Sequence, residues 1–170
     1  ANSAAIRLNE IFESTISVND YPNAKAYDNV DGKIQFSNVT FSYDNNSLAL
    51  NDINLKIAKG ENIVLLGQTG SGKSSLVNLI PRFFDPISGQ VLIDNIDIKD
   101  FTLNSLRRNI GVVHQDAFLF TMSIHDNIAF GKPNASREEV IISAKAAQIH
   151  EYIMTLDHGY DTIVGERGVT

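Results

Sequence analysis

The chain has 170 residues, enough for one domain with a sizeable core and too few for two ordinary domains. Hydrophobic residues make up 43% and charged residues 20%, a globular balance that excludes a wholly disordered chain. The net charge of -6, with its scattered lysines and arginines, argues against a nucleic-acid binder that acts by neutralising phosphates.

The N-terminal part of the chain predicts a short helix followed by a polar connection. Apolar residues recur at helical spacing between residues 4 and 14, which indicates a short amphipathic helix. The stretch 17–32 is rich in Asn, Asp, Pro and Gly and predicts a linker or surface loop. We therefore expect residues 1–31 to precede a main domain that spans residues 32–170.

Three further segments predict an antiparallel sheet. Residues 34–43 partly alternate between apolar and polar side chains, with an irregularity near Asn38. A second strand is expected at residues 50–57 and a third at residues 89–93. Two other runs, 62–66 and 110–113, are apolar without alternation, which predicts strands that are covered on both faces.

Two helices are predicted after the sheet begins. The first spans residues 74–84 and is stopped by Asp85-Pro86, because a proline disfavours helical backbone in the residue before it. The second is opened by Ser136, with Glu139 three residues later in capping-box spacing, and it runs to about His150.

The segment Gly67–Ser74 carries the strongest functional signal, because it matches the pattern G-x-x-x-x-G-K-S completely. A predicted buried strand precedes it and a predicted helix follows, as this phosphate-binding motif requires. Glycines let successive backbone N–H groups turn inward on a phosphate. Lys73 can bring its charge to the β and γ phosphates, and the Ser74 hydroxyl can ligate Mg²⁺. The structural alternative is a glycine-rich turn with a solvated Lys73.

From residue 34 onward the order of motifs resembles the nucleotide-binding domain of exporter-type ABC transporters, such as multidrug or lipid exporters. Phe41-Ser42-Tyr43 resembles the A-loop of that family, and Gly89–Asp94 is similar to the strand after its first helix. Residues 110–128 resemble the Q-loop and its continuation, and residues 159–168 resemble the X-loop that leads into the signature motif.

The resemblance implies roles for individual residues. Tyr43 would stack on the adenine base, and Gln115 would contact Mg²⁺ or the attacking water. The implied cofactors are ATP and Mg²⁺, with Lys73 and Gln115 as catalytic residues and with Ser74 and Gln115 as metal ligands. The implied nucleotide-binding residues are Tyr43, Gly67, Gln68, Thr69, Gly70, Ser71, Gly72, Lys73, Ser74 and Ser75.

These residues also have plainer interpretations. Tyr43 can be a strand-end aromatic residue, and Gln115 can be an ordinary polar residue at the end of a strand. Phe118–Phe120 would face the coupling helices of the membrane domain, but they can belong to the core unless they form an exposed patch. Glu166 and Arg167 can be a surface ion pair of little energetic consequence.

The sequence departs from the family pattern at Thr170, where the family continues into its signature motif, so we expect a truncated domain. Hydrolysis needs a group that positions the water and a second carboxylate for the metal, and the Walker B strand, D-loop and switch histidine that supply such groups in the family are missing. We expect the fragment to bind Mg-ATP at most and not to hydrolyse it alone. We also expect self-association, because the strand at 62–66 would lack neighbours.

The predicted fold class is α/β, a P-loop NTPase-like core with an antiparallel β subdomain that is incomplete on its C-terminal side. The favoured function is the ATP-binding part of a transporter that couples ATP hydrolysis to export. A stand-alone nucleotide-binding module without turnover is the alternative. A P-loop kinase or GTPase is a third, although the guanine-reading Asn-Lys-x-Asp pattern is missing.

The resemblance also predicts partners and location. The partners would be the transmembrane domain of the same transporter, which residues 1–31 would follow, and a second nucleotide-binding domain, at the cytoplasmic face of the membrane. No apolar run reaches about eighteen residues, no signal peptide is recognisable and there is no cysteine. The fragment itself is therefore expected to be soluble and in a reducing compartment, and its net charge of -6 predicts no nucleic-acid partner.

Overall fold

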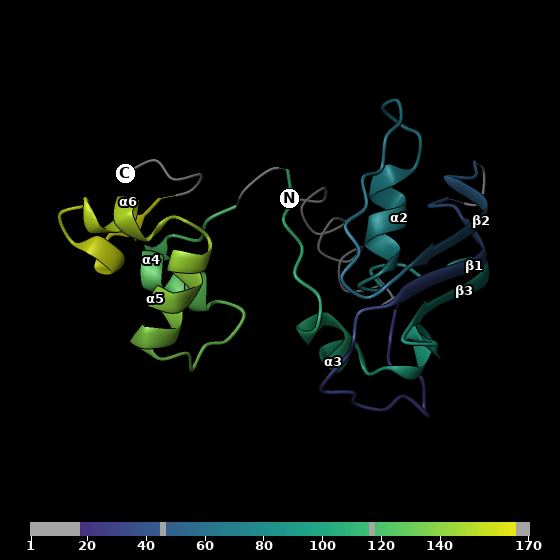
Figure 1. Ribbon diagram of the computed structural model, residues 1–170, viewed down its shortest axis with the longest axis horizontal. Helices are drawn as coiled ribbons and strands as arrows, with labels where there is room; N and C mark the ends of the chain where they lie inside the picture. Colours follow the sequence, from purple (N-terminus) through teal and green to yellow (C-terminus); the bar gives the residue numbers. More distant parts are fainter. Residues whose placement is uncertain (1–17, 45–46, 116–117, 166–170) are drawn as a thin grey trace, which may run out of the picture. The chain divides into compact units, whose positions relative to one another are not determined.

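The computed structural model describes residues 18–44, 47–115 and 118–165. It divides the chain into two compact units, Ala1–Gly111 and Val112–Thr170, each of which has its own hydrophobic cluster (Figure 1). The helix predicted at residues 4–14 lies outside the described residues, as does the end of the predicted X-loop. The division into residues 1–31 and 32–170 stays a prediction.

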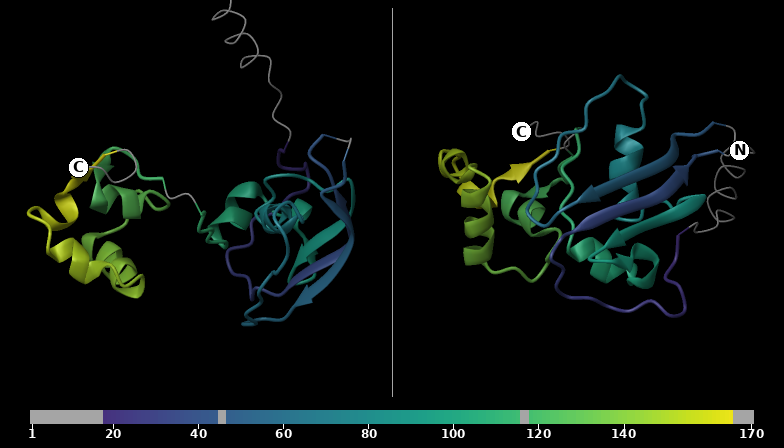
Figure 2. Two further views of the ribbon diagram at one scale, coloured as in Figure 1. Left: turned by 90° about the horizontal axis from the view of Figure 1, so that it is seen from above. Right: turned by 45° about the vertical axis from the view of Figure 1, so that its right-hand side comes forward.

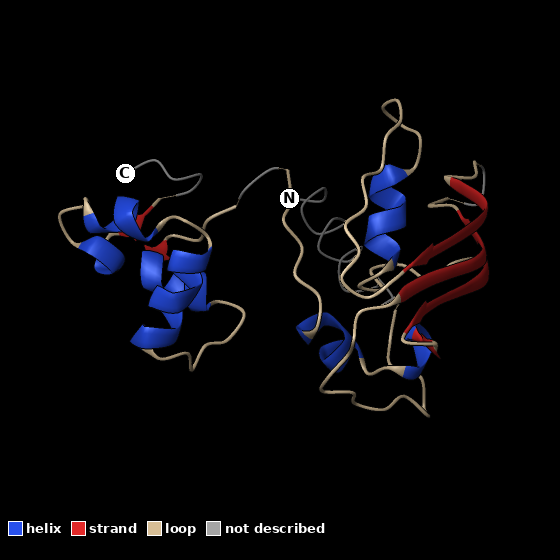
Figure 3. Ribbon diagram, viewed as in Figure 1, coloured by secondary structure: helices blue, strands red, loops and turns tan. Residues whose placement is uncertain are grey.

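The first unit is built on an antiparallel sheet, as predicted (Figure 3). Its strands are β1 (Ile34–Phe41), β2 (Leu50–Ile57), β3 (Ser88–Ile93) and the short β4 (Ile96–Asp97). Their order across the sheet is β2-β1-β3-β4, and each neighbouring pair is antiparallel. The three strands expected from the sequence are therefore confirmed, with bounds that shift by at most two residues.

The predicted irregularity near Asn38 is also present. The pairing of β1 with β2 shifts register between Phe36 and Val39, and Asn38 itself has a φ of 49°. Opposite this point a Cβ on Gly89 would lie 2.3 Å from the Asn38 carbonyl oxygen, so only glycine fits there. The bulge thus explains both a positive φ on β1 and a glycine on β3.

Helix α2 (Lys73–Leu79) lies against one face of the sheet (Figure 2). A 3-10 turn, η1 (Ile98–Asp100), and helix α3 (Leu103–Arg108) complete the unit. Burial of apolar side chains is the main force that holds such layers together. The buried residues of this cluster are Phe36, Val39, Phe41, Leu50, Leu76, Leu79, Val91, Ile93, Ile98, Phe101 and Leu106.

The segment before β1 is irregular, as the sequence predicted for residues 17–32, and it packs along the first unit. The ring of Tyr27 lies 4.6 Å from that of Phe101, and the Tyr27 N–H donates to the Ser105 hydroxyl at 3.0 Å. Lys25 forms an isolated bridge with Phe101. The described part of the predicted linker is therefore anchored by backbone and ring contacts at Lys25 and Tyr27.

Helix α2 is shorter than the predicted helix at residues 74–84. It ends at Leu79, and the chain continues in turns. Pro81 has no N–H to donate to the carbonyl four residues earlier, and Arg82 has a φ of 52°, which no helix accommodates. The stop signal is therefore Pro81, and the prediction that the helix extends to Asp85-Pro86 is wrong.

The two predicted buried strands are not formed. Residues 62–66 and 110–113 have no strand assignment, and the exposed fractions of Val64, Leu66 and Val113 are 81%, 89% and 99%. A strand of this type depends on neighbours that pair with it and cover both faces. Within the described residues no strand pairs with either run, so the apolar pattern alone does not produce the strand.

The second unit is mainly helical, and helix α5 carries the predicted capping box. Ser136 Oγ accepts a hydrogen bond from the Glu139 N–H at 3.2 Å, while the Ser136 N–H donates to Glu139 Oε2 at 2.8 Å. The helix ends at Ala146 rather than near His150, because Gln148 has a φ of 61°. The elements of the unit are β5 (Met122–Ser123), α4 (Ile124–Ala129), α5 (Arg137–Ala146), α6 (His150–Met154), η2 (Gly159–Asp161) and β6 (Ile163–Val164).

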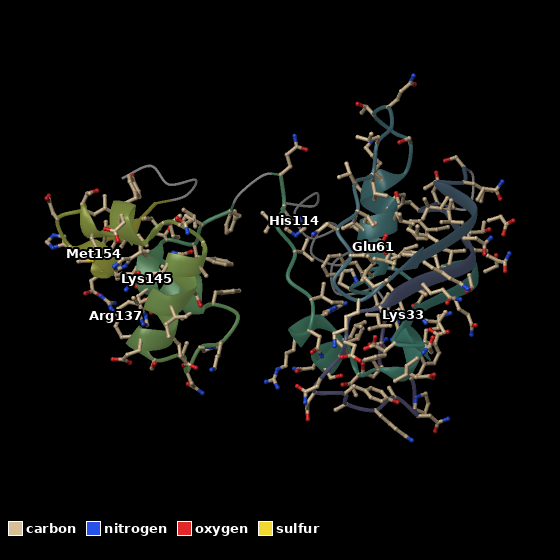
Figure 4. All side chains as sticks on the ribbon, viewed as in Figure 1. Lys33, Glu61, His114, Arg137, Lys145 and Met154 are labelled. Carbon is tan, nitrogen blue, oxygen red and sulfur yellow. The ribbon has the colours of Figure 1, made fainter. Side chains whose placement is uncertain are left out.

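Polar contacts tie α5 and α6 to the turn η2. Arg137, labelled in Figure 4, donates two hydrogen bonds to Asp161 at 3.0 and 3.2 Å, and its guanidinium lies 4.8 Å from the ring centre of Tyr160. The Tyr160 hydroxyl also lies 2.9 Å from His150 Nδ1. The described start of the segment that resembles the X-loop is thereby fixed to both helices. No helix among the described residues is both long and apolar enough to cross a membrane.

Candidate nucleotide-binding site

The glycine-rich loop lies immediately before α2, which begins at Lys73 (Figure 1). Gly72 occupies the N-cap of this helix with a φ of 87°. A Cβ at Gly72 would lie 2.5 Å from the backbone oxygen of Ala49, so the turn into the helix requires a glycine for both conformation and space. Gly70 also has a positive φ, of 83°. The predicted junction of loop and helix is therefore present.

The ammonium group of Lys73 lies inside the loop. Its Nζ donates hydrogen bonds to the carbonyl oxygens of Gly67 at 2.8 Å and Gln68 at 2.7 Å, and to Ser71 Oγ at 3.2 Å. The Ser71 N–H in turn donates to the Gln68 carbonyl at 3.2 Å. The loop that the motif assigns to phosphate thus holds the Lys73 ammonium through two carbonyl oxygens and one hydroxyl.

The residues present fit a nucleotide with its metal. A Cβ at Gly67 would lie 2.6 Å from Ser71 Oγ, so a larger residue there would displace the Ser71 hydroxyl from its place beside Lys73. Ser74 is exposed, and the first turn of α2 has no acidic residue that would repel a phosphate. Mg²⁺ takes one or two protein ligands and completes its shell with phosphate oxygens and water, so a single hydroxyl at Ser74 suffices from this side.

Tyr43 lies next to this loop. It follows β1, and its hydroxyl donates a hydrogen bond to Ser75 Oγ at 3.0 Å. Its ring meets those of Phe41 and Phe84 nearly at right angles, with centroids 4.8 and 5.1 Å apart. The side chain is nevertheless 55% exposed. The structure therefore brings Tyr43 into contact with Ser75 of α2 while much of the tyrosine stays exposed to solvent.

Gln115 belongs to the second unit and is exposed. Figure 4 marks its neighbour His114 on the extended segment that leads to it. Its predicted contact with Mg²⁺ or the attacking water stays a prediction.

Three phenylalanines form an exposed cluster on the second unit. Phe118 and Phe120 lie 5.0 Å apart edge to face, and Phe120 stacks on Phe130 at 4.3 Å. Their exposed fractions are 61%, 37% and 57% in chain order. The interpretation of Phe118 and Phe120 as core residues is therefore wrong, because the rings pack on one another at the surface.

Sequence reasoning missed two contributors to these sites, and it gave no contact between Tyr43 and Ser75 although it named both residues. Phe84 contacts Tyr43, and Phe130 extends the exposed aromatic cluster. Each comes from a segment distant from its partner in sequence. No spacing rule connects these residues, so only the fold could have revealed the contacts.

The sequence was compared with known protein families and with curated proteins. Residues 50–168 match the family described as ABC transporter. A Bacillus subtilis protein named as the multidrug export ATP-binding/permease protein YgaD is 48% identical over 164 residues, which are 96% of this chain and 28% of that protein. A Staphylococcus aureus protein of the same description is 53% identical over 139 residues, 81% of this chain and 24% of the relative.

A solved structure of an ABC exporter has a similar fold. It is described as a bacterial Atm1-family ABC exporter with ATP bound, and it matches with a TM-score of 0.85 and 42% sequence identity. The match covers 98% of this chain and 30% of that chain. The chain thus spans about a quarter to a third of the length of these relatives.

Proposed function

The chain belongs to the ABC transporter family, and we propose that it is the ATP-binding part of a transporter that couples ATP binding and hydrolysis to export across a membrane. The observation that carries this proposal is the Lys73 ammonium inside the glycine loop, with the half-exposed ring of Tyr43 bonded to the same helix. Family membership removes the kinase and GTPase alternatives. The relatives named as multidrug exporters support export as the process that is driven.

Each group of the loop has a distinct task in this proposal. Lys73 exchanges its bonds with the Gly67 and Gln68 carbonyls for bonds to phosphate oxygens, and the backbone N–H groups of the loop hold the remaining oxygens. Ser74 presents a hydroxyl to Mg²⁺, and Tyr43 offers an aromatic face to the base. ATP supplies the phosphoryl group whose transfer releases the energy.

Turnover needs groups that we assign to other parts of the transporter. Positioning the attacking water and holding the metal from its far side take further side chains, including a carboxylate. We propose that Gln115 supplies one contact to the metal or the water. The missing carboxylate would come from sequence outside these 170 residues, since the chain spans only 28% of the relative from Bacillus subtilis. Alone, the chain is expected to bind ATP without hydrolysing it.

The exposed aromatic cluster supports a partner. Phe118, Phe120 and Phe130 form an apolar patch of the kind that marks a protein interface, and the relatives are named as permeases. We assign this patch to contact with the transmembrane domain, at the cytoplasmic face of the membrane. A second nucleotide-binding domain would complete the hydrolytic site, and self-association is proposed where these partners are missing.

The proposal is tested by titrating Mg-ATP into the chain and into Lys73→Ala while phosphate release is measured. Lys59→Ala is a matched control, because it removes an exposed lysine of the same unit whose ion pair with Asp31 lies at the surface. We expect saturable binding without turnover in the wild type and in Lys59→Ala, and loss of binding in Lys73→Ala. Equal binding by all three chains would refute the phosphate loop as the site.

A further inference from the structure

The side chain of Tyr43 is held from several directions although it is half-exposed. Its hydroxyl is bonded to Ser75, and its ring is flanked by those of Phe41 and Phe84 at interplanar angles of 78° and 88°. Phe41 and Ser75 are only 2% and 6% exposed, so two of these three partners are fixed within the core. The remaining exposed part of the ring is therefore presented in one defined orientation.

We propose that Ser75 is a positioning residue for Tyr43, and that with Phe84 it fixes the ring in place to stack on the base of a bound nucleotide. The inference rests on the proposed function, because it concerns the base subsite of the same site. It assigns to Ser75 a task toward the base, in addition to its place on the helix that follows the phosphate loop.

The physical reason lies in the freedom of a tyrosine outside a strand. Tyr43 follows the end of β1, so neither ladder hydrogen bonds nor burial of the whole side chain restrict its rotamer. A bond from the phenolic hydroxyl to a buried acceptor removes that freedom, and the perpendicular ring contacts limit tilting. A ring that is already oriented loses less entropy when it stacks on a ligand, which strengthens binding.

The bond also connects two parts of the site. Ser75 belongs to α2, and the Leu76 N–H after it donates to the Gly72 carbonyl at the end of the loop. The tyrosine is thus attached to the helix whose first residue is Lys73. Removing the hydroxyl of Tyr43 should loosen the base subsite and leave the loop unchanged. A ligand with a base should therefore be affected, and a triphosphate without one should not.

The experiment is a double-mutant cycle with Tyr43→Phe, Ser75→Ala and the double variant, measured with two ligands. Calorimetric titration gives the affinity for Mg-ATP and for Mg-tripolyphosphate, which lacks the base. Tyr152→Phe is the matched control, since it makes the same change at an exposed tyrosine of the second unit. Circular dichroism and thermal unfolding establish that each variant is folded.

We expect Tyr43→Phe to weaken ATP binding by about two- to tenfold, the worth of one hydrogen bond, and to leave tripolyphosphate binding unchanged. The double variant should bind ATP no more weakly than the weaker single variant, because both remove the same bond. Phe84→Leu should also weaken ATP binding selectively. If Ser75→Ala does not fold, the contrast between the two ligands in Tyr43→Phe decides alone.

Two results would overturn the inference and spare the proposed function. One is a double variant whose loss equals the product of the single losses, and the other is an equal loss for both ligands in Tyr43→Phe. In both cases Lys73→Ala would still abolish the binding of ATP and tripolyphosphate. A wild-type chain that binds neither ligand would instead overturn the inference together with the proposed function.

Discussion

Arg82 and Asp85 form a two-pronged ion pair in the turn after α2, with Nε to Oδ1 at 2.7 Å and Nη2 to Oδ2 at 3.1 Å. The arginine side chain is 1% exposed, and Nη2 also donates to the Asn19 carbonyl at 3.0 Å. Burial opposes the charged form of Arg82, but the hydrogen bond and the charge of Asp85 outweigh it and raise the pKa of Arg82 above its ordinary value. Arg82 thereby connects the start of the described chain, at Asn19, to the turn after α2.

Asp85→Ala should lower the free energy of unfolding of the first unit by about 3 kcal/mol, because it leaves a buried guanidinium without its counter-charge. Chemical denaturation followed by far-ultraviolet circular dichroism measures the change. Lys59→Ala breaks the exposed pair with Asp31 and should leave the unfolding midpoint nearly unchanged. Equal losses of unfolding free energy in Asp85→Ala and Lys59→Ala would contradict the view that burial makes the Arg82–Asp85 pair the stronger one.

Two glycines of the loop allow strain and steric clash to be separated. Gly70 and Gly72 both have positive φ, but a Cβ at Gly70 meets nothing within 4 Å, whereas one at Gly72 meets Ala49 and Leu50. Gly70→Ala should cost about 1 kcal/mol of stability from backbone strain alone. Gly72→Ala should cost more than about 2 kcal/mol, because the loop or β2 must also move. Thermal unfolding of both variants checks the order, and a reversed order would refute it.

Ser74→Ala tests the proposed metal ligand. ATP titrations with Mg²⁺ and with EDTA give the gain in affinity that the metal provides. We expect this gain to shrink in Ser74→Ala, while affinity for ATP in EDTA stays close to that of the wild type, because the substitution removes one ligand of the ion and no phosphate donor. The same gain is measured in Ser71→Ala for comparison, since Ser71 Oγ contacts Lys73 within the loop and is not proposed as a metal ligand. An unchanged metal dependence in Ser74→Ala would exclude Ser74 as a ligand.

The second unit should lose stability in acid partly through Glu139. The hydrogen bond from Lys132, followed by that from the Ser136 N–H, lowers the pKa of Glu139 below its ordinary 4.5. A carboxyl whose pKa is lowered by folding contributes stability above its ordinary pKa and loses it as the pH falls through the lowered value. Glu139→Gln should therefore show a smaller drop in melting temperature between about pH 6 and pH 3. Lys132→Met should act in the same direction, and identical pH profiles in all three chains would contradict this account.

The exposed apolar run predicts self-association. Val64 and Leu66 present 81% and 89% of their surface to solvent, within a segment that has no strand partner in the described chain. Replacing both by serine should shift the sedimentation profile toward monomer, because apolar contact area is lost. Leu48→Ser, at an exposed leucine outside this run, is the control and should leave the profile unchanged. A wild-type chain that sediments as a monomer would refute the prediction.

The features that the sequence predicted correctly are those with a local cause. Partial alternation predicted β1, whose apolar residues Phe36, Val39 and Phe41 are buried, and the irregularity at Asn38 appeared where the alternation breaks. The capping box at Ser136 and Glu139 needs only residues three apart, and both of its hydrogen bonds are present. The positive φ angles of Gly70 and Gly72 are likewise a local requirement of the loop backbone.

The features that the sequence did not predict depend on distant partners. The run at 62–66 has the composition of a buried strand, but composition does not supply the neighbouring strands that make it one. The end of α2 is set by Pro81, whereas the sequence pattern predicted the later Asp85-Pro86 as the stop signal. The contact between Tyr43 and Ser75 joins residues 32 positions apart, and no periodicity relates them.

The two hydrophobic clusters have consequences for how the chain unfolds. Among the described residues the first cluster holds eleven buried members and the second holds five, and none is shared. Cooperative opening follows the apolar contacts that break together, so each unit should exchange its amide protons as a separate group. The smaller cluster should open first on warming. A single melting temperature would then average two transitions, and calorimetry of the chain should resolve them as two heat-absorption peaks.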